Sequence, residues 1–392
     1  MKILIAGYPY IKESYFKTFS FYPEKNEVFF LLPTVWKAKG GKLKFYPPRE
    51  DNVYMASAYF FHSNYPIIGG LLKGWMPSFP LALFKIRKRI DIVYSPSEPI
   101  LLTMLYQGLW AKILGKKHVI FTWENIPYEE KFRGINLLIK KSVLRLNLLF
   151  CDGLICGNRK SLDIHRQLTR KPIAEIPLSG VDEVFFQKTG SPKIFKSMNL
   201  ENKVVFSFAG AIGRRKGVHL ILEALAAVVK KIPNAYLIIA GSGEYEESLK
   251  LKVESLKLQE LVTFVPWLNR DELRELLSVS DVFLYPSISY GGWEEQFGYS
   301  IAEASLMELP IISTRSGSIE GLVVDGKTGI LVESNNINPL KEAMIKLAED
   351  PGLRMAFGRE GRQFVVNNYS YEVVARKFYD FLSSLIIKNP NS

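Results

Sequence analysis

Short apolar runs and helical patterns alternate from one end of the chain to the other, and this alternation limits the fold more than any other feature. In the first half the runs are residues 2–7, 27–32, 91–95, 118–123 and 152–157. In the second half they are residues 204–210, 235–241, 262–266, 281–287, 310–314 and 329–333. Several are hydrophobic nearly end to end, as a strand buried on both faces of a sheet must be. Strands that alternate with helices at this spacing form parallel, doubly wound α/β sheets.

The chain is too long for one ordinary hydrophobic core, because it has 392 residues. Between the two strand series lies a polar segment with Gly and Pro, residues 185–203. The sequence therefore predicts two Rossmann-like domains, residues 1–190 and 200–370, and a C-terminal helix over 371–392 that returns to the first domain. Ligands of such sheets bind beyond the carboxyl ends of the strands, so we expect the two domains to face each other across a cleft.

Composition excludes several classes of protein. Hydrophobic residues make up 47% of the chain and charged residues 23%, which is typical of a globular protein. The two cysteines, Cys151 and Cys156, indicate neither a disulfide framework nor a zinc site. The opening MKILIAGYPY is interrupted by Gly7 and Pro9 too early for a signal peptide, and no apolar stretch is uninterrupted enough to span a membrane. We expect a cytoplasmic protein, with the inner face of the cell membrane as a site of peripheral attachment.

The net charge of +12 is confined to the first half of the chain. Residues 1–185 hold 27 lysines and arginines against 15 acidic residues, whereas residues 186–392 hold 24 of each. Such asymmetry favours an anionic partner for the first half, namely a membrane surface, a phosphorylated lipid or a nucleic acid, although a solvated basic face explains any single cluster equally well. Residues 59–89 mix aromatic and basic groups as a membrane-surface segment does. No nucleic-acid-binding motif is present.

A basic loop follows the first strand of the second domain. The strand ends at Gly210, and Arg214, Arg215 and Lys216 precede a helix that opens at Gly217. Positive side chains and free backbone amides at a helix start favour phosphate, and a solvated loop is the alternative.

The next two strands also end in candidate ligand-binding loops. Gly241 and Gly243 would allow the backbone to approach a ligand closely, although glycine is also ordinary in such turns. Trp267 and Leu268 follow the third strand, where they would either wall a base pocket or belong to the core.

Two glutamates flank a predicted helix start in EEQFGYSIAEASLMELP. Glu295 lies on the loop before the helix and Glu303 about a turn and a half into it, and we expect both to be partly exposed. Between them are Phe297, Gly298 and Tyr299, whose free amides would face phosphates. Carboxylates on either side of an amide-rich turn suit a nucleotide sugar, which has hydroxyls at both ends and a diphosphate in the middle.

The second half resembles the retaining, family 4 (group 1) glycosyltransferases of the GT-B fold. The resemblance rests on E-x7-E with an internal Phe-Gly, on the Lys-Gly and Gly-x-Gly turns, and on residues 176–186 and 316–333. It spans roughly residues 150–370. It implies that Glu303 binds the ribose of the donor nucleotide and Glu295 the hydroxyls of the donor sugar. It also implies that Lys216 neutralises the diphosphate leaving group. Many members have an arginine directly after the glycine of the first loop, where this chain has Ala211, so we expect Arg214 or Arg215 to substitute.

The first half matches this family more loosely. Members often have a glycine pair after the first strand, whereas this chain has only Gly7. The position of a common histidine is taken by Glu124, which would hold sugar hydroxyls near the reacting carbon or support another group. His118 is expected to be structural.

The resemblance implies a sugar transferase that uses a nucleotide-diphosphate sugar, requires no metal and retains the anomeric configuration. No Asp-x-Asp metal motif is evident. The basic, aromatic first domain favours a lipid-linked or membrane-proximal acceptor. Two alternatives remain open: a nucleotide-sugar epimerase or phosphorylase on the same fold, and a non-catalytic basic binding protein.

Overall fold

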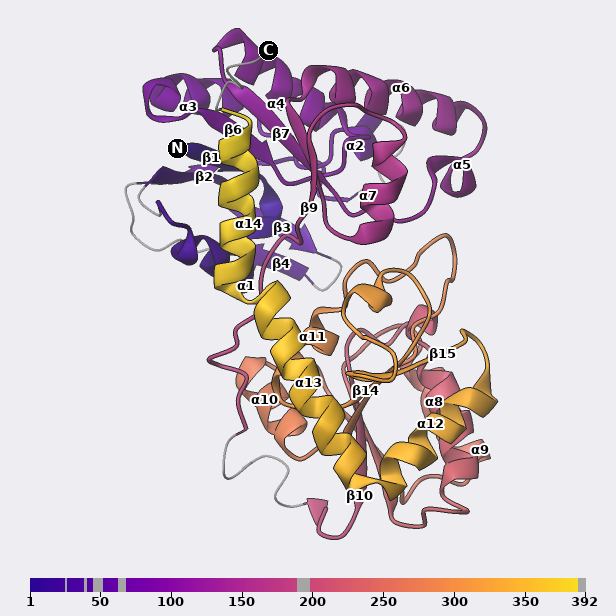
Figure 1. Ribbon diagram of the computed structural model, residues 1–392. Coiled ribbons are helices and arrows are strands. Elements are labelled where there is room, and N and C mark those ends of the chain that lie inside the picture. The colour runs from indigo at the N-terminus through magenta and orange to yellow at the C-terminus, as the bar shows by residue number, and fades with distance from the viewer. Residues whose placement is uncertain (25–26, 39–40, 45–51, 63–67, 189–197, 387–392) are drawn as a thin grey trace. The chain divides into compact units, whose positions relative to one another are not determined.

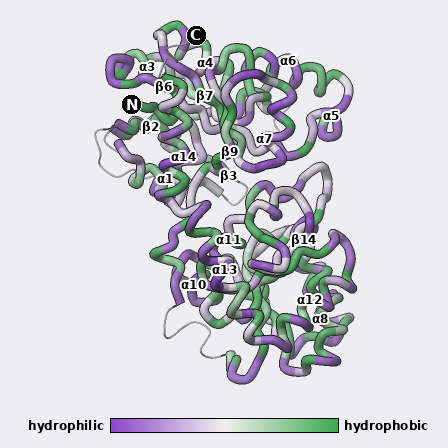
Figure 2. Tube along the Cα trace, viewed as in Figure 1, coloured by the Kyte–Doolittle hydropathy of each residue, from purple (hydrophilic) through white to green (hydrophobic). Residues whose placement is uncertain are grey.

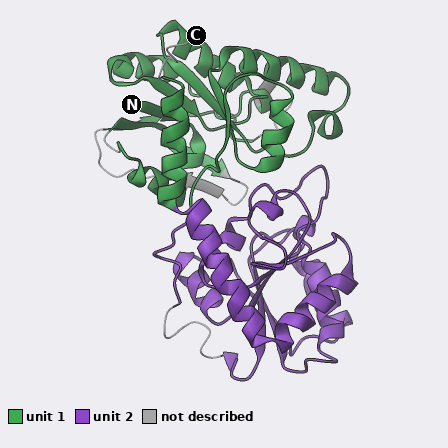
Figure 3. Ribbon diagram, viewed as in Figure 1, with its two compact units in different colours: residues 1–180, 371–392 green, residues 181–370 purple. Residues whose placement is uncertain are grey.

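The computed structural model describes residues 1–24, 27–38, 41–44, 52–62, 68–188 and 198–386. The chain divides into two compact units, one formed by residues 1–180 and 371–392 and the other by residues 181–370 (Figure 3). We call them unit 1 and unit 2. Each unit is a parallel sheet covered by helices (Figure 1), which confirms the predicted α/β fold with two Rossmann-like domains.

Unit 1 is built on a seven-stranded parallel sheet. In sheet order the strands are β5 (Val53–Ala56), β2 (Val28–Pro33), β1 (Ile3–Ala6), β6 (Ile92–Ser95), β7 (Lys117–Thr122), β8 (Gly153–Cys156) and β9 (Ile173–Glu175). Its helices include α1 (Glu13–Thr18), α2 (Ile68–Leu71), α3 (Phe79–Ile86), α4 (Leu102–Ile113), α5 (Tyr128–Lys131), α6 (Gly134–Phe150), α7 (Arg159–Arg166) and α14 (Tyr371–Ser384). The sequence pattern predicted five of these strands and missed the short β5 and β9, as well as the hairpin β3 (Val35–Ala38) and β4 (Gly41–Lys44).

Unit 2 is built on a six-stranded parallel sheet, and all six strands match predicted runs. In sheet order they are β12 (Val262–Val265), β11 (Ala235–Ala240), β10 (Val204–Ala209), β13 (Val282–Tyr285), β14 (Ile311–Thr314) and β15 (Gly329–Val332). The helices are α8 (Val218–Val228), α9 (Glu246–Ser255), α10 (Arg270–Ser278), α11 (Tyr299–Leu306), α12 (Ile337–Glu349) and α13 (Pro351–Tyr369). The central strands are almost fully buried, and Figure 2 shows hydrophobic residues concentrated along both sheets.

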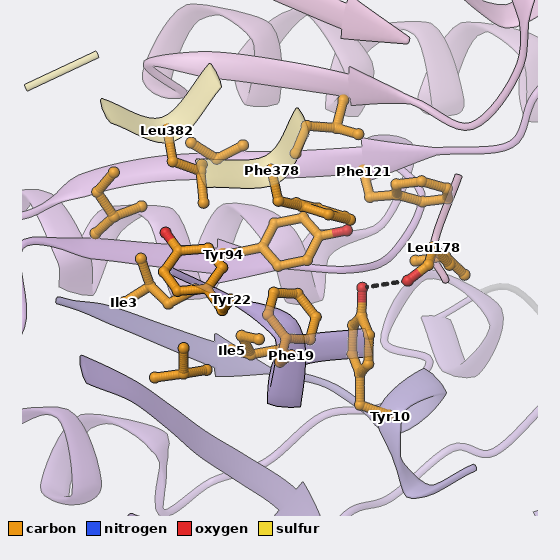
Figure 4. Close-up of a cluster of buried hydrophobic side chains, with 14 of the residues drawn as sticks. Ile3, Ile5, Tyr10, Phe19, Tyr22, Tyr94, Phe121, Leu178, Phe378 and Leu382 are labelled. Carbon is orange, nitrogen blue, oxygen red and sulfur yellow. Dashed lines mark hydrogen bonds between the residues drawn. The ribbon is translucent and has the colours of Figure 1, made fainter. Parts of the chain in front are cut away.

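The final helix packs in unit 1, on one face of its sheet (Figure 4). Phe378 and Leu382 of α14 contact a buried cluster that contains Ile3, Ile5 and Tyr94. This cluster is extended at its edge by Tyr10, whose hydroxyl donates a hydrogen bond to the Leu178 carbonyl. The apolar side of the amphipathic helix α14 is therefore covered by the first sheet, although it follows unit 2 in the chain.

The division between the units falls at Gly180, earlier than the predicted segment 185–203. Polar contacts hold the intervening residues to unit 2: Asp182 forms an ion pair with Arg270 at 3.1 Å, and Arg362 donates a hydrogen bond to the Phe186 carbonyl. The predicted linker thus begins within a segment that packs in unit 2. Residues 189–197 of the predicted linker lie outside the described residues.

Candidate functional site

The candidate site of unit 2 lies where the strand order of its sheet reverses, between β10 and β13. The loops that follow these two strands lead to helices on opposite faces of the sheet and leave room for a ligand between them. The loop after β10 passes through the 3-10 turn η6 (Arg214–Lys216) into α8, and the loop after β13 leads to Glu295 and α11. The predicted basic turn and the predicted carboxylate therefore meet at this point.

Lys216, Tyr285 and Glu295 form a buried polar cluster. The Lys216 ammonium donates hydrogen bonds to the Tyr285 hydroxyl and to Oε2 of Glu295. The Tyr285 hydroxyl donates to the same Glu295 oxygen at 2.9 Å. A lysine and a glutamate are seldom buried unless they are paired, so these contacts explain how both charges are accommodated.

Burial and the ion pair act on these three groups in different directions. Burial raises the pKa of Glu295, but the positive charge of Lys216, aided by Arg215 and the Tyr285 hydroxyl, outweighs it and leaves that pKa below its ordinary value. Burial lowers the pKa of Lys216, and the Glu295 charge offsets only part of this effect. Burial, reinforced by Glu295, raises the pKa of Tyr285 well above its ordinary range. A diphosphate bound at this cluster would therefore contact the Lys216 ammonium, which is positioned by the Glu295 carboxylate.

Two glycines fix the backbone around this cluster. Gly217 has a φ of 69°, and a Cβ there would lie 1.9 Å from the Pro286 carbonyl oxygen. Gly317 has a φ of 58°, and a Cβ there would lie 2.2 Å from the Glu295 carbonyl oxygen. Only glycine fits either position, because both the torsion angle and the space exclude a side chain. The main chain on both sides of the cluster is thus held by close loop-to-loop contact.

Of the two arginines in the basic turn, only Arg215 is brought to the cluster by the contacts in the structure. Its Nη1 lies 3.6 Å from Oε2 of Glu295. The guanidinium of Arg214 instead lies over the ring of Tyr290, 5.3 Å from the ring centroid. Arg215, rather than Arg214, is therefore the arginine beside Glu295.

The second glutamate of the motif has a different environment from the first. Glu303 lies in α11 and is partly exposed, as expected, whereas Glu295 is only 8% exposed. The expectation that Glu295 is partly exposed is wrong, because Lys216 and Tyr285 cover it.

The turn between the two glutamates has the local geometry of a helix start. Gly298 is the N-cap of α11 and has a φ of 87°. Phe297 is buried, with its ring centroid 4.7 Å from that of Tyr299 and 5.2 Å from that of Tyr369. The buried ring anchors the turn that begins α11.

Close packing between two loops explains why glycine occupies positions 241 and 243 after β11, which the sequence alone did not show. A Cβ on Gly241 would lie 1.9 Å from the Gly210 carbonyl oxygen, and one on Gly243 would lie 2.3 Å from the Ile212 carbonyl oxygen. The second loop therefore packs directly on the backbone of the first. This contact accounts for Gly241 and Gly243 without a ligand.

The side chains after β12 are not part of the core. Trp267 is 64% exposed and Leu268 is partly exposed. The alternative that they belong to the core is therefore wrong. An exposed indole beyond the carboxyl end of a strand is available to stack on a base.

The equivalent reversal point of unit 1 lies between β1 and β6. Gly7 follows β1, and a Cβ there would lie 2.8 Å from Cγ of Pro96, which follows β6. Its φ of 166° is extended backbone, so crowding by Pro96 rather than torsional freedom requires glycine. Gly7 thus allows close approach of a neighbouring loop.

Glu124 lies just beyond β7 in a buried group of charged side chains. Its Oε2 accepts a hydrogen bond from the Lys131 ammonium at 2.7 Å, while the buried Oε1 has no hydrogen-bond partner among the described residues. Glu98 lies nearby and accepts hydrogen bonds from the Thr122 hydroxyl at 2.6 Å and the Trp123 amide at 2.9 Å. Burial, together with the charge of Glu124, raises the pKa of Glu98 to about 7. A second carboxylate, not singled out from the sequence, therefore accompanies Glu124.

The buried histidines of unit 1 are held by hydrogen bonds. Nε2 of His118 lies 2.9 Å from the Ser95 hydroxyl, and burial lowers the pKa of His118 to about 3. Nδ1 of His165 lies 2.7 Å from the Ser161 carbonyl and must donate to it, so Nε2 accepts from the Tyr128 hydroxyl at 2.9 Å. Both rings are neutral parts of the core.

Sequence reasoning missed Tyr285, Gly317 and Glu98 as members of these sites. Tyr285 is the last residue of β13, at the reversal point of the sheet, and this position is the signal that identifies it. Gly317 and Glu98 had no comparable signal, since their contacts join segments distant in the chain.

Three further observations concern metal binding, the two cysteines and membrane-spanning helices. In the described part of the chain, no group of three or more His, Cys, Asp or Glu side chains is arranged to hold a metal ion. Cys151 and Cys156 are buried free thiols. Among the described helices, none combines the length and the apolar character needed to cross a membrane.

The two tandem Rossmann-like sheets define the chain as a protein of the GT-B fold. Residues 191–364, nearly all of unit 2, match the family described as glycosyl transferases group 1. The match confirms the resemblance inferred from the E-x7-E region.

Curated relatives cover the chain to different extents. A GDP-mannose-dependent alpha-(1-6)-phosphatidylinositol monomannoside mannosyltransferase of Mycolicibacterium smegmatis is 30% identical over 171 residues, which are 43% of this chain and 45% of that protein. The match thus spans less than half the length of this relative. An uncharacterized glycosyltransferase of Methanocaldococcus jannaschii is 24% identical over 374 residues, 93% of this chain and 91% of that protein.

Solved structures show the same fold at low sequence identity. The Anabaena protein HepE, solved in complex with UDP, has a TM-score of 0.75 and 19% identity, and the alignment covers 98% of this chain and 100% of that one. Sucrose-phosphate synthase of Thermosynechococcus elongatus has a TM-score of 0.71 and 17% identity over 98% and 99% of the two chains. These similarities establish the architecture of both units.

Proposed function

We propose that this protein is a retaining glycosyltransferase that moves a hexose from a nucleotide-diphosphate sugar to a lipid-linked acceptor in glycan biosynthesis. The observation that carries the proposal is the buried cluster of Lys216, Tyr285 and Glu295 at the strand reversal of unit 2. It combines a cation for a phosphate with a carboxylate for sugar hydroxyls in one place.

Each residue of the cluster has a role in the proposed reaction. Lys216 and Arg215 stabilise the negative charge that develops on the departing diphosphate, where fixed charges lower the barrier most. Glu295 accepts hydrogen bonds from the hydroxyls of the donor sugar, and Tyr285 keeps its carboxylate in position. Glu303 binds the ribose, and Trp267 stacks on the base.

The proposed transfer occurs on one face of the sugar. The bond between the anomeric carbon and the diphosphate oxygen breaks, and the acceptor hydroxyl oxygen bonds to the same face of that carbon. The acceptor proton passes to the departing diphosphate, so that no separate base is required. Because the cations of the protein stabilise the leaving group, we expect turnover to persist in the presence of a metal chelator.

Glu124 is proposed to bind a hydroxyl of the reacting sugar or of the acceptor. Its Oε1 is buried and lacks a partner among the described residues, and a buried carboxylate oxygen without a hydrogen bond is costly. A substrate hydroxyl that donates to this oxygen would recover the lost hydrogen bond.

The acceptor class is supported by two features. Relatives of unit 2 include mannosyltransferases named for phosphatidylinositol monomannoside and a lipopolysaccharide core glycosyltransferase of Rhizobium meliloti. The basic excess of residues 1–185 is what an enzyme that works at an anionic membrane requires.

The proposal is tested by stabilisation, turnover and product configuration. A panel of UDP- and GDP-sugars is screened for one that raises the melting temperature of the protein, since a ligand of the native state stabilises it. Transfer of that sugar is then measured for wild type, Glu295→Gln and the neighbouring control Glu294→Gln. We expect loss of transfer only in Glu295→Gln, and an NMR spectrum that shows the same anomeric configuration in donor and product.

Three results would contradict the proposal. Inversion of configuration would exclude retention. Conversion of the donor without an acceptor would indicate an epimerase. Normal transfer by a folded Glu295→Gln variant would remove the cluster from the reaction.

A further inference from the structure

Three helices form a continuous layer on one face of the unit 1 sheet. Helix α4 packs between α3 and α6, and all three lie together in Figure 1. Their inner sides bury residues such as Leu83 of α3, Ala111 of α4 and Leu148 of α6 against the strands. The outer sides of these helices face away from the hydrophobic core of unit 1.

The outer side of this layer is unusually apolar. The structure describes 19 large hydrophobic residues as exposed, and eight of them lie on these three helices. They are Leu81 and Phe84 of α3, Leu109 and Ile113 of α4, and Ile135, Leu138, Leu146 and Leu149 of α6. A surface helix ordinarily turns polar residues outward, and a large exposed apolar patch marks an interaction site.

The exposed residues of α6 form one stripe along the helix. At 3.6 residues per turn, Ile135, Leu138, Leu146 and Leu149 fall within an arc of about 80°. The opposite side of α6 is also apolar, because Val143, Leu144 and Leu148 are buried. Such a helix needs an apolar environment on both sides, and the described residues of unit 1 supply only one.

The same layer contains basic residues and no acidic ones. Residues 79–89, 102–113 and 134–150 hold eight lysines and arginines and no aspartate or glutamate. Lys112 and Lys141 are neutralised by Asp152 and Glu129, which lie outside these helices. Lys85, Lys88 and Arg145 form no ion pair within the described residues, so their charges are available to an anionic partner.

We propose that the outer face of α3, α4 and α6 is the surface by which this protein docks on an anionic lipid bilayer. The apolar side chains enter the boundary between headgroups and acyl chains, and the unpaired cations contact the headgroup phosphates. A second copy of the chain is a poorer partner, because the two faces would have charge of the same sign. This inference deepens the proposed function, since it locates the membrane contact of a lipid-acceptor transferase.

The inferred surface differs from the segment that the sequence favoured. Residues 79–89 of the predicted membrane segment 59–89 belong to it, through α3 and the basic turn that follows. Residues 63–67 of that segment lie outside the described residues. The larger part of the surface comes from α4 and α6, which the aromatic and basic composition of residues 59–89 did not indicate.

The experiment measures sedimentation of the 392-residue chain with vesicles, without donor or acceptor. The test variant is Ile135→Gln/Leu138→Gln/Leu149→Gln, whose positions are 70%, 61% and 66% exposed. The matched control is Val184→Gln/Leu251→Gln/Met355→Gln in unit 2, whose positions are 73%, 66% and 61% exposed. Vesicles of phosphatidylglycerol and of phosphatidylcholine are compared at low and high salt.

We expect wild type and control to bind phosphatidylglycerol vesicles, less strongly at high salt and on phosphatidylcholine. The α6 variant should bind at least about tenfold more weakly, since each buried aliphatic side chain contributes substantially to partitioning. Equal binding of variant and wild type, or no binding of wild type, would overturn the inference. A dimer that the α6 substitutions dissociate would assign the face to self-association instead.

Nucleotide binding separates this inference from the proposed function. The melting temperature of the α6 variant with UDP and GDP should rise as it does for wild type, because the substituted positions lie outside unit 2. Failure of vesicle binding with normal nucleotide stabilisation contradicts only the docking surface. Vesicle binding without any nucleotide stabilisation contradicts only the transferase.

Discussion

The two sheets share one strand order but place different side chains at the point where that order reverses. In unit 2 the first strand is followed by the basic turn η6 and the eleven-residue helix α8. In unit 1 the first strand is followed by the aromatic turn η1 (Tyr8–Ile11) and the six-residue helix α1, which has Glu13 in its first turn. One topology thus provides a site suited to phosphate in unit 2 and a different environment in unit 1.

Buried carboxylates show the same contrast. Glu295 of unit 2 is neutralised by Lys216 and Arg215 and has a lowered pKa. Glu98 of unit 1 lies beside Glu124 and has a raised pKa. In unit 2 the cations outnumber the carboxylate, whereas in unit 1 two carboxylates share Lys131. The two sites therefore differ in their balance of charge, although the fold around them is the same.

The largest effect should come from breaking the buried pair of unit 2. We expect Lys216→Met to lower the free energy of unfolding by about 3–5 kcal/mol, because Glu295 would be left buried without its main counter-charge. The double variant Lys216→Met/Glu295→Gln should recover most of this loss. Urea unfolding measures both.

A surface lysine provides the control for the buried pair. Lys250→Met removes ion pairs with Glu246 and Glu247 on α9 and should change stability little. A double variant no more stable than Lys216→Met would show that the pair is not the source of the effect.

The next largest effect should be the loss of turnover when Lys216 is substituted. In conditions where the variant is folded, Lys216→Met should lower kcat by about 10²–10³-fold and change donor binding less, since charge on the leaving group is greatest in the transition state. Steady-state kinetics with varied donor separates the two. An effect confined to KM would mean that Lys216 only binds the donor.

The pH dependence of stability at Glu98 tests the contrast between the carboxylates of the two units. Its pKa is about 7 in the folded protein and lower in the unfolded chain, so ionisation opposes folding increasingly as pH rises from about 4.5 to 7. Glu98→Gln removes this penalty, and its stability relative to wild type should therefore rise across that range and then level off. Urea unfolding at pH 4.5, 6 and 8 measures the trend. Among the charged neighbours of Glu98, Glu124 raises its pKa and Lys131 lowers it, so a flat difference would mean that burial and Glu124 do not raise that pKa.

The smallest effect concerns one exposed charge of unit 1. We expect Lys85→Gln to weaken binding to phosphatidylglycerol vesicles by about fivefold at low salt, because one cation near an anionic surface contributes about 1 kcal/mol. Lys257→Gln on the surface of unit 2 is the matched control and should have no effect. Equal losses for both variants would show that net charge, rather than the position of the charge, governs binding.

The periodic pattern of the sequence determined the fold class and nearly all of the sheets. Long, buried β-branched runs are unambiguous because a strand covered on both faces has no polar positions. The edge strands β5 and β9, of four and three residues, were missed, and most of their residues are only partly buried. Short edge strands depend on their neighbours rather than on their own composition.

The sequence also determined which segments of unit 2 form the candidate site. Glu295, Lys216 and the glycine turns are recognisable because the chemistry and the backbone torsions both restrict residue type at these positions. The burial of Glu295, the position of Arg215 beside it and the contacts of Tyr285 were decided only by tertiary structure. They depend on distances between segments about 70 to 80 residues apart in the chain, which no local pattern encodes.

The charge excess of unit 1 was visible in the sequence, but the surface that displays it was not. Composition alone pointed to residues 59–89, which contain both aromatic and basic residues. Which apolar residues of α4 and α6 are buried and which are exposed depends on how each helix rotates against the sheet. That rotation is set by packing of both helices on β6, β7 and β8, so an apolar face directed toward solvent becomes evident only in the folded protein.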